Sequence, residues 1–193
     1  MDKIDDYDTD FKTPLGEGAF GSVYRGTHKT KGVTVALKRM TIKKSSPDLK
    51  FLLDLAKQEI ETIKSVRGHP NIVDFIAFKE ESQPNNILMW LIAEFCSLGD
   101  LSTYSINYWL QTGQHLVIME QIASGLAYLH GHKPPLLHRD VKPTNILVTL
   151  ANRRHVVKVA DFGVSRVIES ERSKETMTVI GTPEYQAPEL LDE

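Results

Sequence analysis

A glycine-rich segment near the amino terminus has the composition of a loop that could bind phosphate. Its glycines are Gly16, Gly18 and Gly21, and Ser22 and Val23 follow directly. Because glycine has no side chain, backbone N–H groups in such a loop can approach phosphate oxygens closely. The next residues have strand and turn character, which disfavours the strand-to-helix turn of dinucleotide-binding folds. Alone, the segment is equally compatible with an ordinary glycine-rich hairpin.

A lysine and a glutamate form a second candidate pair. Lys38 ends the β-like run that begins at Val35, and Glu59 falls on the apolar stripe of the helix predicted to follow. A buried carboxylate without a partner is strongly disfavoured, so an inward Glu59 predicts a cation within reach, and Lys38 is the candidate. Taken singly, each residue is more often a solvated surface side chain.

The third cluster combines a carboxylate and an amide at a fixed spacing. Residues 138–145 read His-Arg-Asp-Val-Lys-Pro-Thr-Asn, a pattern that places Asp140 to accept a hydroxyl proton and Asn145 to hold a metal ion. Residues 161–163 then read Asp-Phe-Gly, and residues 187–189 read Ala-Pro-Glu. Five motifs in this order do not arise together by chance.

In this order, the motifs resemble those of a eukaryotic protein kinase, from about residue 11 to the last residue. Lys142, two residues after Asp140, is the residue with which serine/threonine kinases steady the moving phosphoryl group, and residues 181–185 resemble their substrate-docking segment. The resemblance implies ATP-dependent transfer of a phosphoryl group to a serine or threonine hydroxyl of a protein substrate. It also implies an upstream kinase that modifies the segment between Asp161 and Glu189, where Thr178 is the leading candidate and Ser173 and Thr176 come next.

The resemblance further implies roles in phosphate and metal binding. Lys38, paired with Glu59, would hold the α- and β-phosphates of ATP, and Asp161 and Asn145 would hold Mg²⁺. Asp140 would orient the attacking hydroxyl. Phosphoryl transfer through a loose transition state needs chiefly positioning and charge neutralisation, so this small set of residues suffices.

An adenine site is also implied by the resemblance. The segment from Glu94 to Cys96 resembles the hinge between two lobes, whose backbone would bind the adenine. Val23, Ala36 and Leu147 would hold the ring between them, although each also fits ordinary core packing. In the same family, the histidine that matches His138 is structural and packs on the phenylalanine that matches Phe162.

The elements that position these residues are strands first and helices later, which predicts an α+β fold. Residues 11–40 predict hairpin-connected antiparallel strands, and two further strands are predicted within residues 69–78 and 85–95. Ser46 and Pro47 predict a helix start as N-cap and first helical residue. The inward stripe of this helix is Leu49, Leu52, Ala56, Ile63 and Val66.

The predicted architecture is bilobal and resembles the protein kinase fold. An acidic segment, residues 1–10, precedes a domain at 11–193 with an antiparallel β-sheet lobe at about 11–93 and a hinge at about 94–98. An incomplete, mostly helical lobe follows at about 99–193. Its core helix is predicted within residues 115–130, with an inward face of Leu116, Met119, Ala123, Leu126 and His130.

Composition bounds the class of protein. The 193 residues are 41% hydrophobic, enough for a core of one domain or two small lobes. With 23 basic and 25 acidic residues, the formal charge of −2 gives no general attraction to nucleic acid or anionic membranes.

The longest apolar run, Ile87–Ala93, is far shorter than the roughly 18 residues of a membrane span. One cysteine, Cys96, and no leader predict a reducing cytoplasmic location, with the nucleus also compatible.

The end of the sequence raises an alternative function. The chain stops just after residues 187–189, where the family continues through further helices, so Glu189 and the apolar positions around Leu126 and Leu129 are expected to lose partners. An active kinase and a truncated, inactive nucleotide-binding or regulatory interaction module both fit. The intact Lys38, Asp140, Asn145 and Asp161 favour the kinase, whereas the incomplete lobe predicts little or no turnover by the chain itself and a tendency to self-associate.

Overall fold

The chain forms two compact units, which are described separately. In a computed structural model, the described residues are 4–18, 21–108, 110–162, 166–167 and 181–188. Unit 1 contains residues 1–65 and 74–95, and unit 2 contains residues 66–73 and 96–193. The chain therefore passes from unit 1 into unit 2 and back before the final crossing after Phe95.

Unit 1 contains an antiparallel sheet, which confirms the predicted strand-rich first segment. Its order is β1-β3-β4-β6-β5, and β2 pairs with β3. The strands are β1 (Tyr7–Thr9), β2 (Gly16–Gly18), β3 (Gly21–His28), β4 (Thr34–Lys43), β5 (Phe75–Ser82) and β6 (Asn86–Glu94), and the short helix η1 (Ile4–Asp6) precedes them. The strand predicted from residue 69 begins only at Phe75, because residues 66–73 belong to unit 2.

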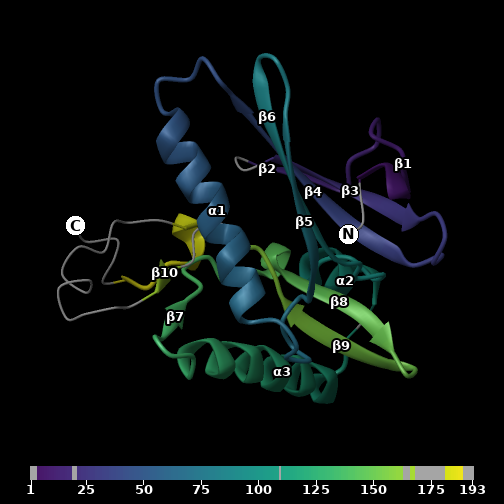
Figure 1. Cartoon of the computed structure of the whole chain (residues 1–193). Coiled ribbons are helices and arrows are strands. Elements are labelled where there is room, and N and C mark those ends of the chain that lie inside the picture. Colours follow the sequence, from purple (N-terminus) through teal and green to yellow (C-terminus); the bar gives the residue numbers. More distant parts are fainter. Residues whose placement is uncertain (1–3, 19–20, 109, 163–165, 168–180, 189–193) are drawn as a thin grey trace. The chain divides into compact units, whose positions relative to one another are not determined.

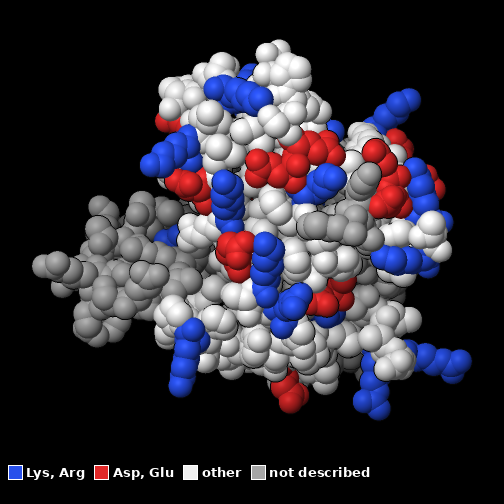
Figure 2. Space-filling model, viewed as in Figure 1, with Lys and Arg blue, Asp and Glu red and all other residues white. Residues whose placement is uncertain are grey.

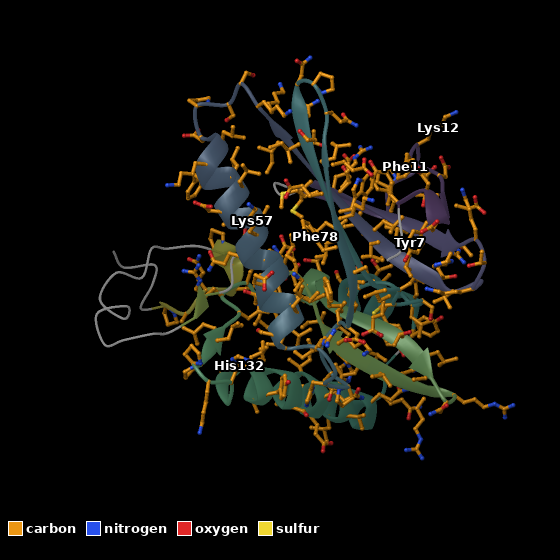
Figure 3. All side chains as sticks on the ribbon, in the orientation of Figure 1. Tyr7, Phe11, Lys12, Lys57, Phe78 and His132 are labelled. Atoms are coloured by element: carbon orange, nitrogen blue, oxygen red, sulfur yellow. The ribbon has the colours of Figure 1, made fainter. Side chains whose placement is uncertain are left out.

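The amino-terminal segment contributes to one face of this sheet. The strand period of two places Tyr24, Leu37 and Trp90 in one buried cluster, which also contains Tyr7 of β1. The ring of Phe11 packs against Tyr24 and Trp90, with centroids 5.3 and 5.6 Å apart. Tyr7 and Phe11 are labelled beside β1 in Figure 3. Residues 7–9, within the acidic segment expected to precede the domain, thus form an edge strand.

Helix α1 (Leu49–Ser65) packs on the sheet through an apolar stripe. Of the predicted inward residues, Ala56 and Ile63 are buried, Leu49 and Leu52 are half-buried, and Val66 lies beyond the end of the helix. Ile60, which was not in the predicted stripe, is also buried. The predicted start was wrong, because the helix begins at Leu49 rather than at Pro47. Ser46 does act locally, since its Oγ accepts a hydrogen bond of 3.3 Å from the Asp48 N–H, just before the helix.

Unit 2 combines helices with a β-hairpin (Figure 1). Asp100 is the N-cap of helix α2 (Leu101–Asn107), and its Oδ1 accepts a 2.9 Å hydrogen bond from the Thr103 N–H. Asn152 and Arg153 turn the hairpin with φ of 50° and 61°, the left-handed values of a type I′ turn. The elements are α2 (Leu101–Asn107), α3 (Thr112–His130), β7 (Leu136–Leu137), η2 (Pro143–Asn145), β8 (Ile146–Ala151), β9 (Arg154–Val159), β10 (Arg166–Val167) and η3 (Pro183–Tyr185).

The buried face of α3 differs from the predicted one. Gly125 and Leu129 are buried, and α3 packs against β9 through this side. Leu116 and Met119, both predicted to face inward, are 65% and 64% exposed. Ala123 and His130 are also exposed, and Leu126 is half-buried. The prediction failed because apolar residues surround this helix, so their spacing does not select one face.

The surface of the described residues carries both signs of charge. Lysine, arginine, aspartate and glutamate side chains are interspersed on the face shown in Figure 2, as expected from the formal charge of −2. Among the described helices, none is long and apolar enough to cross a membrane.

Candidate active site

The predicted pair of Lys38 and Glu59 forms in unit 1. Strand β4 places Lys38 on the sheet face that meets α1, and the apolar stripe of α1 carries Glu59 to the same place. Lys38 Nζ donates a 2.6 Å hydrogen bond to Glu59 Oε1. The side chains are only 16% and 3% exposed, so the ion pair is largely desolvated. Lys57, labelled on α1 in Figure 3, is exposed.

The glycine-rich segment forms the hairpin of β2 and β3. Gly16 lies opposite Val23, and Gly18 lies opposite Gly21. Gly21 has a φ of 124°, and a Cβ there would collide with the carbonyl oxygen of Arg39. Only glycine can therefore occupy position 21 without strain. The strand after the glycines confirms that the segment does not lead into a helix.

The predicted adenine-site residues of unit 1 share one sheet face or lie at its end. Val23 is the cross-strand partner of Lys38, and Ala36 lies two residues before Lys38, so all three side chains point to one side. At the end of β6, the Glu94 N–H donates a 3.0 Å hydrogen bond to the carbonyl oxygen of Asp74. The Asp74 N–H in turn donates a 2.6 Å hydrogen bond to Glu94 Oε1.

The remaining two predicted adenine-site residues belong to unit 2. Cys96 is the first residue of unit 2 after the final crossing and is buried. Leu147 lies on β8, is half-buried and forms a bridge with Asp100. The role of the whole set in binding adenine stays a prediction.

The Asp140 carboxylate is the centre of a polar cluster in unit 2. Thr182 Oγ1 donates to Asp140 Oδ1 at 2.7 Å, and the Thr182 N–H donates to the same oxygen at 3.0 Å. Lys142 Nζ lies 2.9 Å from Asp140 Oδ2 and donates to Thr182 Oγ1 at 2.6 Å. Asn145 Nδ2 donates to Asp140 Oδ2 at 2.8 Å. One carboxylate thus accepts hydrogen bonds from an alcohol, an ammonium and an amide.

These contacts determine the ionisation of Asp140. Burial acts to raise its pKa, but the hydrogen bonds from Thr182, Lys142 and Asn145 favour the carboxylate more strongly. The net effect is a pKa below the ordinary value of 3.8. At neutral pH, Asp140 is therefore an ionised hydrogen-bond acceptor.

The backbone before Asp161 is tied to the segment that carries Asp140. The Ala160 N–H donates to the Asn145 carbonyl oxygen at 2.9 Å, and the Ala160 carbonyl oxygen is 2.8 Å from His138 Nε2. Asp161 follows with a φ of 62°, in the left-handed region. The two predicted metal ligands are thus connected through one backbone hydrogen bond at Ala160.

His138 has the structural position that the resemblance implies. It is 2% exposed, and its ring packs against Phe162 with centroids 5.3 Å apart. Burial lowers the pKa of His138, while the Ala160 carbonyl and the nearby Asp161 and Asp140 act in the opposite direction. The imidazole is therefore neutral at pH 7, and its Nε2 carries the hydrogen that bonds the Ala160 carbonyl oxygen.

The donor set suits magnesium. Asp161 supplies a carboxylate and Asn145 a carboxamide oxygen, both of the hard type that Mg²⁺ prefers. In the described residues, the Asn145 side chain makes its hydrogen bonds through Nδ2, to the backbone and side-chain oxygens of Asp140, which keeps its oxygen for a ligand. The described residues contain no group of three or more His, Cys, Asp or Glu side chains able to hold a metal. Mg²⁺ commonly uses one or two protein ligands together with substrate phosphates.

Sequence reasoning missed part of this cluster. Thr182 was predicted to lie in a substrate-docking segment, but its bonds to Asp140 and Lys142 were not predicted. Gly181 directly before it has a φ of 121°, but a glycine in the sequence does not indicate which groups the next side chain contacts. Gly163 and Glu189, and the candidate phosphorylation sites Thr178, Ser173 and Thr176, lie outside the described residues.

Comparison with known proteins establishes the family. The sequence matches the family model described as "Protein kinase domain" over residues 9–193. The chain belongs to the protein kinase domain family.

Several curated relatives are similar over nearly the whole chain. "Probable serine/threonine-protein kinase kinX" of Dictyostelium discoideum is 33% identical over 184 residues, which is 95% of this chain and 16% of that protein. "Cell division control protein 7" of Schizosaccharomyces pombe is 37% identical over 92% of this chain and 15% of its own length. "Misshapen-like kinase 1" of Rattus norvegicus is 35% identical over 92% of this chain and 13% of its own length. The chain therefore spans less than one fifth of each of these relatives.

Proposed function

We propose that the chain transfers the γ-phosphoryl group of Mg-ATP to a serine or threonine hydroxyl of a protein substrate. The observation that carries the proposal is the Asp140 carboxylate, which is ionised and already accepts a hydrogen bond from an alcohol, the Thr182 hydroxyl, at 2.7 Å. A substrate serine or threonine presents the same chemical group. Membership of the protein kinase domain family and the relatives named as serine/threonine kinases support the same activity.

In this proposal, Asp140 orients the acceptor hydroxyl and receives its proton. The hydroxyl oxygen bonds to the γ-phosphorus as the bond from that phosphorus to the β–γ bridging oxygen breaks. The products are a phosphoester and ADP, and the proton passes from Asp140 to solvent. Lys142, held beside Asp140 by a 2.9 Å contact, places a positive charge where the transferred group carries negative charge.

The proposal assigns nucleotide binding to the predicted phosphate, metal and adenine residues. Lys38, fixed by Glu59, contacts the α- and β-phosphates, and the β2–β3 hairpin covers the phosphates with its backbone. Asp161 and Asn145 would hold Mg²⁺, which would neutralise negative charge on the phosphates. Val23, Ala36 and Leu147 contact the adenine, and the backbone from Glu94 to Cys96 binds its edge.

Two finer parts of the proposal concern partners and location. An upstream kinase would phosphorylate the segment between Asp161 and Glu189, with Thr178 first and Ser173 and Thr176 next. A phosphate there adds roughly −1.5 to −2 charge at pH 7, and Arg139 beside Asp140 is a cation that could pair with it. Thr178→Ala should then prevent activation by phosphorylation.

The cytoplasm is the proposed location, since it supplies ATP and keeps Cys96 reduced.

The proposed function is tested by separating binding from transfer. Mg-ATP at a hundredfold excess over Kd should stabilise the wild-type chain by about 2.7 kcal/mol, and Lys38→Ala or Asp161→Ala should reduce this shift in Tm. Asp140→Asn should keep the shift but eliminate transfer of labelled phosphate to a general protein substrate. A wild-type shift without any transfer would support the alternative, a nucleotide-binding regulatory module. The absence of any shift would overturn both functions.

A further inference from the structure

Two side-chain amides complete the outer edge of strand β9. One edge of β9 pairs with β8, and the backbone groups of Val157 and Val159 point away from β8. Gln121 on α3 accepts a 2.8 Å hydrogen bond from the Val157 N–H through Oε1. Asn71 Nδ2 donates to the Val157 carbonyl oxygen at 2.9 Å and to Gln121 Oε1 at 3.2 Å. The two amides therefore pair with Val157 much as a neighbouring strand would.

The backbone around Asn71 continues this pairing toward the candidate site. The Val159 N–H donates to the Asn71 carbonyl oxygen at 2.9 Å, and the Val73 N–H donates to the Val159 carbonyl oxygen at 3.0 Å. Ile72 and Val159 form a parallel bridge, and Lys158 Nζ donates to the Ile72 carbonyl oxygen at 3.3 Å. Residues 71–73 thus serve as a short third strand beside β9.

The contact between this segment and α3 depends on a glycine. A Cβ on Gly125 would lie 2.7 Å from the Asn71 carbonyl oxygen and 3.1 Å from Val159 Cγ2. No real side chain tolerates the first distance, so the close approach requires glycine at position 125. His69 adds a stacked ring contact with Tyr128 of α3, with centroids 4.6 Å apart. Segment 66–73 is therefore packed closely on α3.

The end of β9 leads directly into the candidate metal ligand. Val159 is fixed by residues 71 and 73, and Ala160 is fixed by Asn145 and His138. Only Ala160 separates Val159 from Asp161, so a displacement of Val159 would also displace Asp161. Gln121 and Asn71 act two residues earlier, where they fix the register of β9.

We propose that Gln121 and Asn71 are positioning residues for Asp161: they complete the edge of β9 and so fix the backbone that presents the metal-binding carboxylate. This proposal rests on the proposed function. It assigns the important contact to the Gln121 oxygen, because that atom accepts from both the Val157 N–H and the Asn71 amide. The weaker contact of Gln121 Nε2 with the His155 carbonyl oxygen, at 3.4 Å, is not required.

Two variants of Gln121 separate the acceptor from mere packing. Gln121→Leu keeps a similar size and removes the acceptor, whereas Gln121→Glu retains carboxylate oxygens that accept from the same two donors. Asn71→Asp is a second test of the network, since it removes the donor to the Val157 carbonyl oxygen at constant size. Leu126→Ala, at a half-buried position of the same helix, is the control for a general loss of packing.

The first readout needs no ligand. Amide hydrogen exchange of Val157 and Val159 should be about tenfold faster in Gln121→Leu, because the hydrogen bond from the Val157 N–H to the Gln121 side chain is lost. Gln121→Glu should restore the wild-type rates. The second readout is the Mg²⁺ concentration that gives half of the Mg²⁺-dependent rise in Tm with saturating ADP. It should increase about tenfold in Gln121→Leu and Asn71→Asp, the lower end of the range for outer-shell residues of metal sites.

The outcomes distinguish the two proposals. Leu126→Ala should lower the Tm without changing the Mg²⁺ concentration that gives half of the Mg²⁺-dependent rise in Tm. If this concentration increases in Leu126→Ala as much as in Gln121→Leu, the positioning role is overturned. An unchanged midpoint in Gln121→Leu, with a normal wild-type response, would also overturn the positioning role alone. If the wild-type chain shows no Mg²⁺-dependent response to ADP, the proposed function fails and the positioning role fails with it.

Discussion

Lys38 and Glu59 make a hydrogen-bonded ion pair of 2.6 Å in which the carboxylate is 3% exposed. The two residues are 21 positions apart in the sequence and come from β4 and α1. Such a pair links the helix to the sheet, but its net contribution to stability is small because both charges lose hydration. Its energetic importance appears when one partner is removed.

Lys38→Met should therefore destabilise the fold more than the loss of one surface lysine. A buried carboxylate left without its partner costs about 3–5 kcal/mol, and urea unfolding would measure this loss. The double variant Lys38→Met/Glu59→Leu should regain much of the stability, because both charges of the pair are removed together. If the double variant is as unstable as the sum of the two single variants, the ion pair does not determine the stability here.

Thr182 should matter through its hydroxyl rather than its methyl group. Thr182→Val removes the hydrogen bonds to Asp140 and Lys142 at constant shape, and hydrogen bonds to charged groups contribute about 1.5–3 kcal/mol. We expect the rate of phosphoryl transfer to fall about 10- to 100-fold, measured with labelled ATP. Thr182→Ser keeps the hydroxyl and should stay within a few-fold of wild type. Equal rates for the Val and Ser variants would contradict this role.

His138 should make stability depend on pH in the mildly acidic range. Because burial lowers its pKa from the ordinary value of 6.5, the folded chain binds fewer protons at this residue than the unfolded chain does below that pH. Its contribution is complete above about pH 6.5 and is lost as the pH falls through the folded pKa. The slope contributed by one proton is at most about 1.4 kcal/mol per pH unit.

The variant His138→Tyr tests this linkage. At pH 7.5, His138 is neutral in both the folded and the unfolded wild-type chain. The difference in the free energy of unfolding between variant and wild type at this pH therefore gives the cost of the substitution itself. Between pH 6.5 and 5, the wild-type chain should lose stability more steeply than the variant. Parallel curves from chemical unfolding at each pH would show that His138 does not titrate differently in the folded chain.

Exposed apolar residues of α3 should promote self-association. Leu116, Val117 and Met119 are 65%, 51% and 64% exposed on neighbouring positions. Leu116→Gln combined with Met119→Gln should lower the apparent mass in light scattering at micromolar concentration. Val33→Gln is a suitable control, because Val33 is 52% exposed at the turn between β3 and β4. An equal effect of the control would indicate general rather than α3-mediated association.

The sequence predicted best those features that depend on a few residues with strict geometric demands. The strand after the glycine-rich segment and the partnership of Lys38 and Glu59 were predicted from residue types and spacing, and the structural position of His138 was predicted from the resemblance to protein kinases. The sheet was predictable from β-branched runs and turn residues, and α1 from its apolar stripe. Prediction failed at the start of α1, where proline and serine signals preceded the helix by two residues.

The missed features involve contacts without a sequence signature. The apolar residues of α3 surround the helix, so the buried face depends on where β9 and residues 66–73 pack rather than on spacing. Asn71 and Gln121 are 50 positions apart, and their amides pair with backbone groups that every residue possesses. No pattern of residue types marks such a pairing, because the backbone acceptor and donor are independent of sequence.

The close approach at Gly125 also limits how this sequence can change over evolutionary time. Every single-nucleotide change that replaces this glycine adds at least a Cβ, which would meet the Asn71 carbonyl oxygen at 2.7 Å. A neutral path to another residue would require the backbone of residues 71–73 to shift first, and that shift would break its hydrogen bonds to Val159. Random mutagenesis with selection for folded protein should consequently recover glycine alone at codon 125, while the neighbouring codon for Ser124, an exposed residue, accepts many replacements.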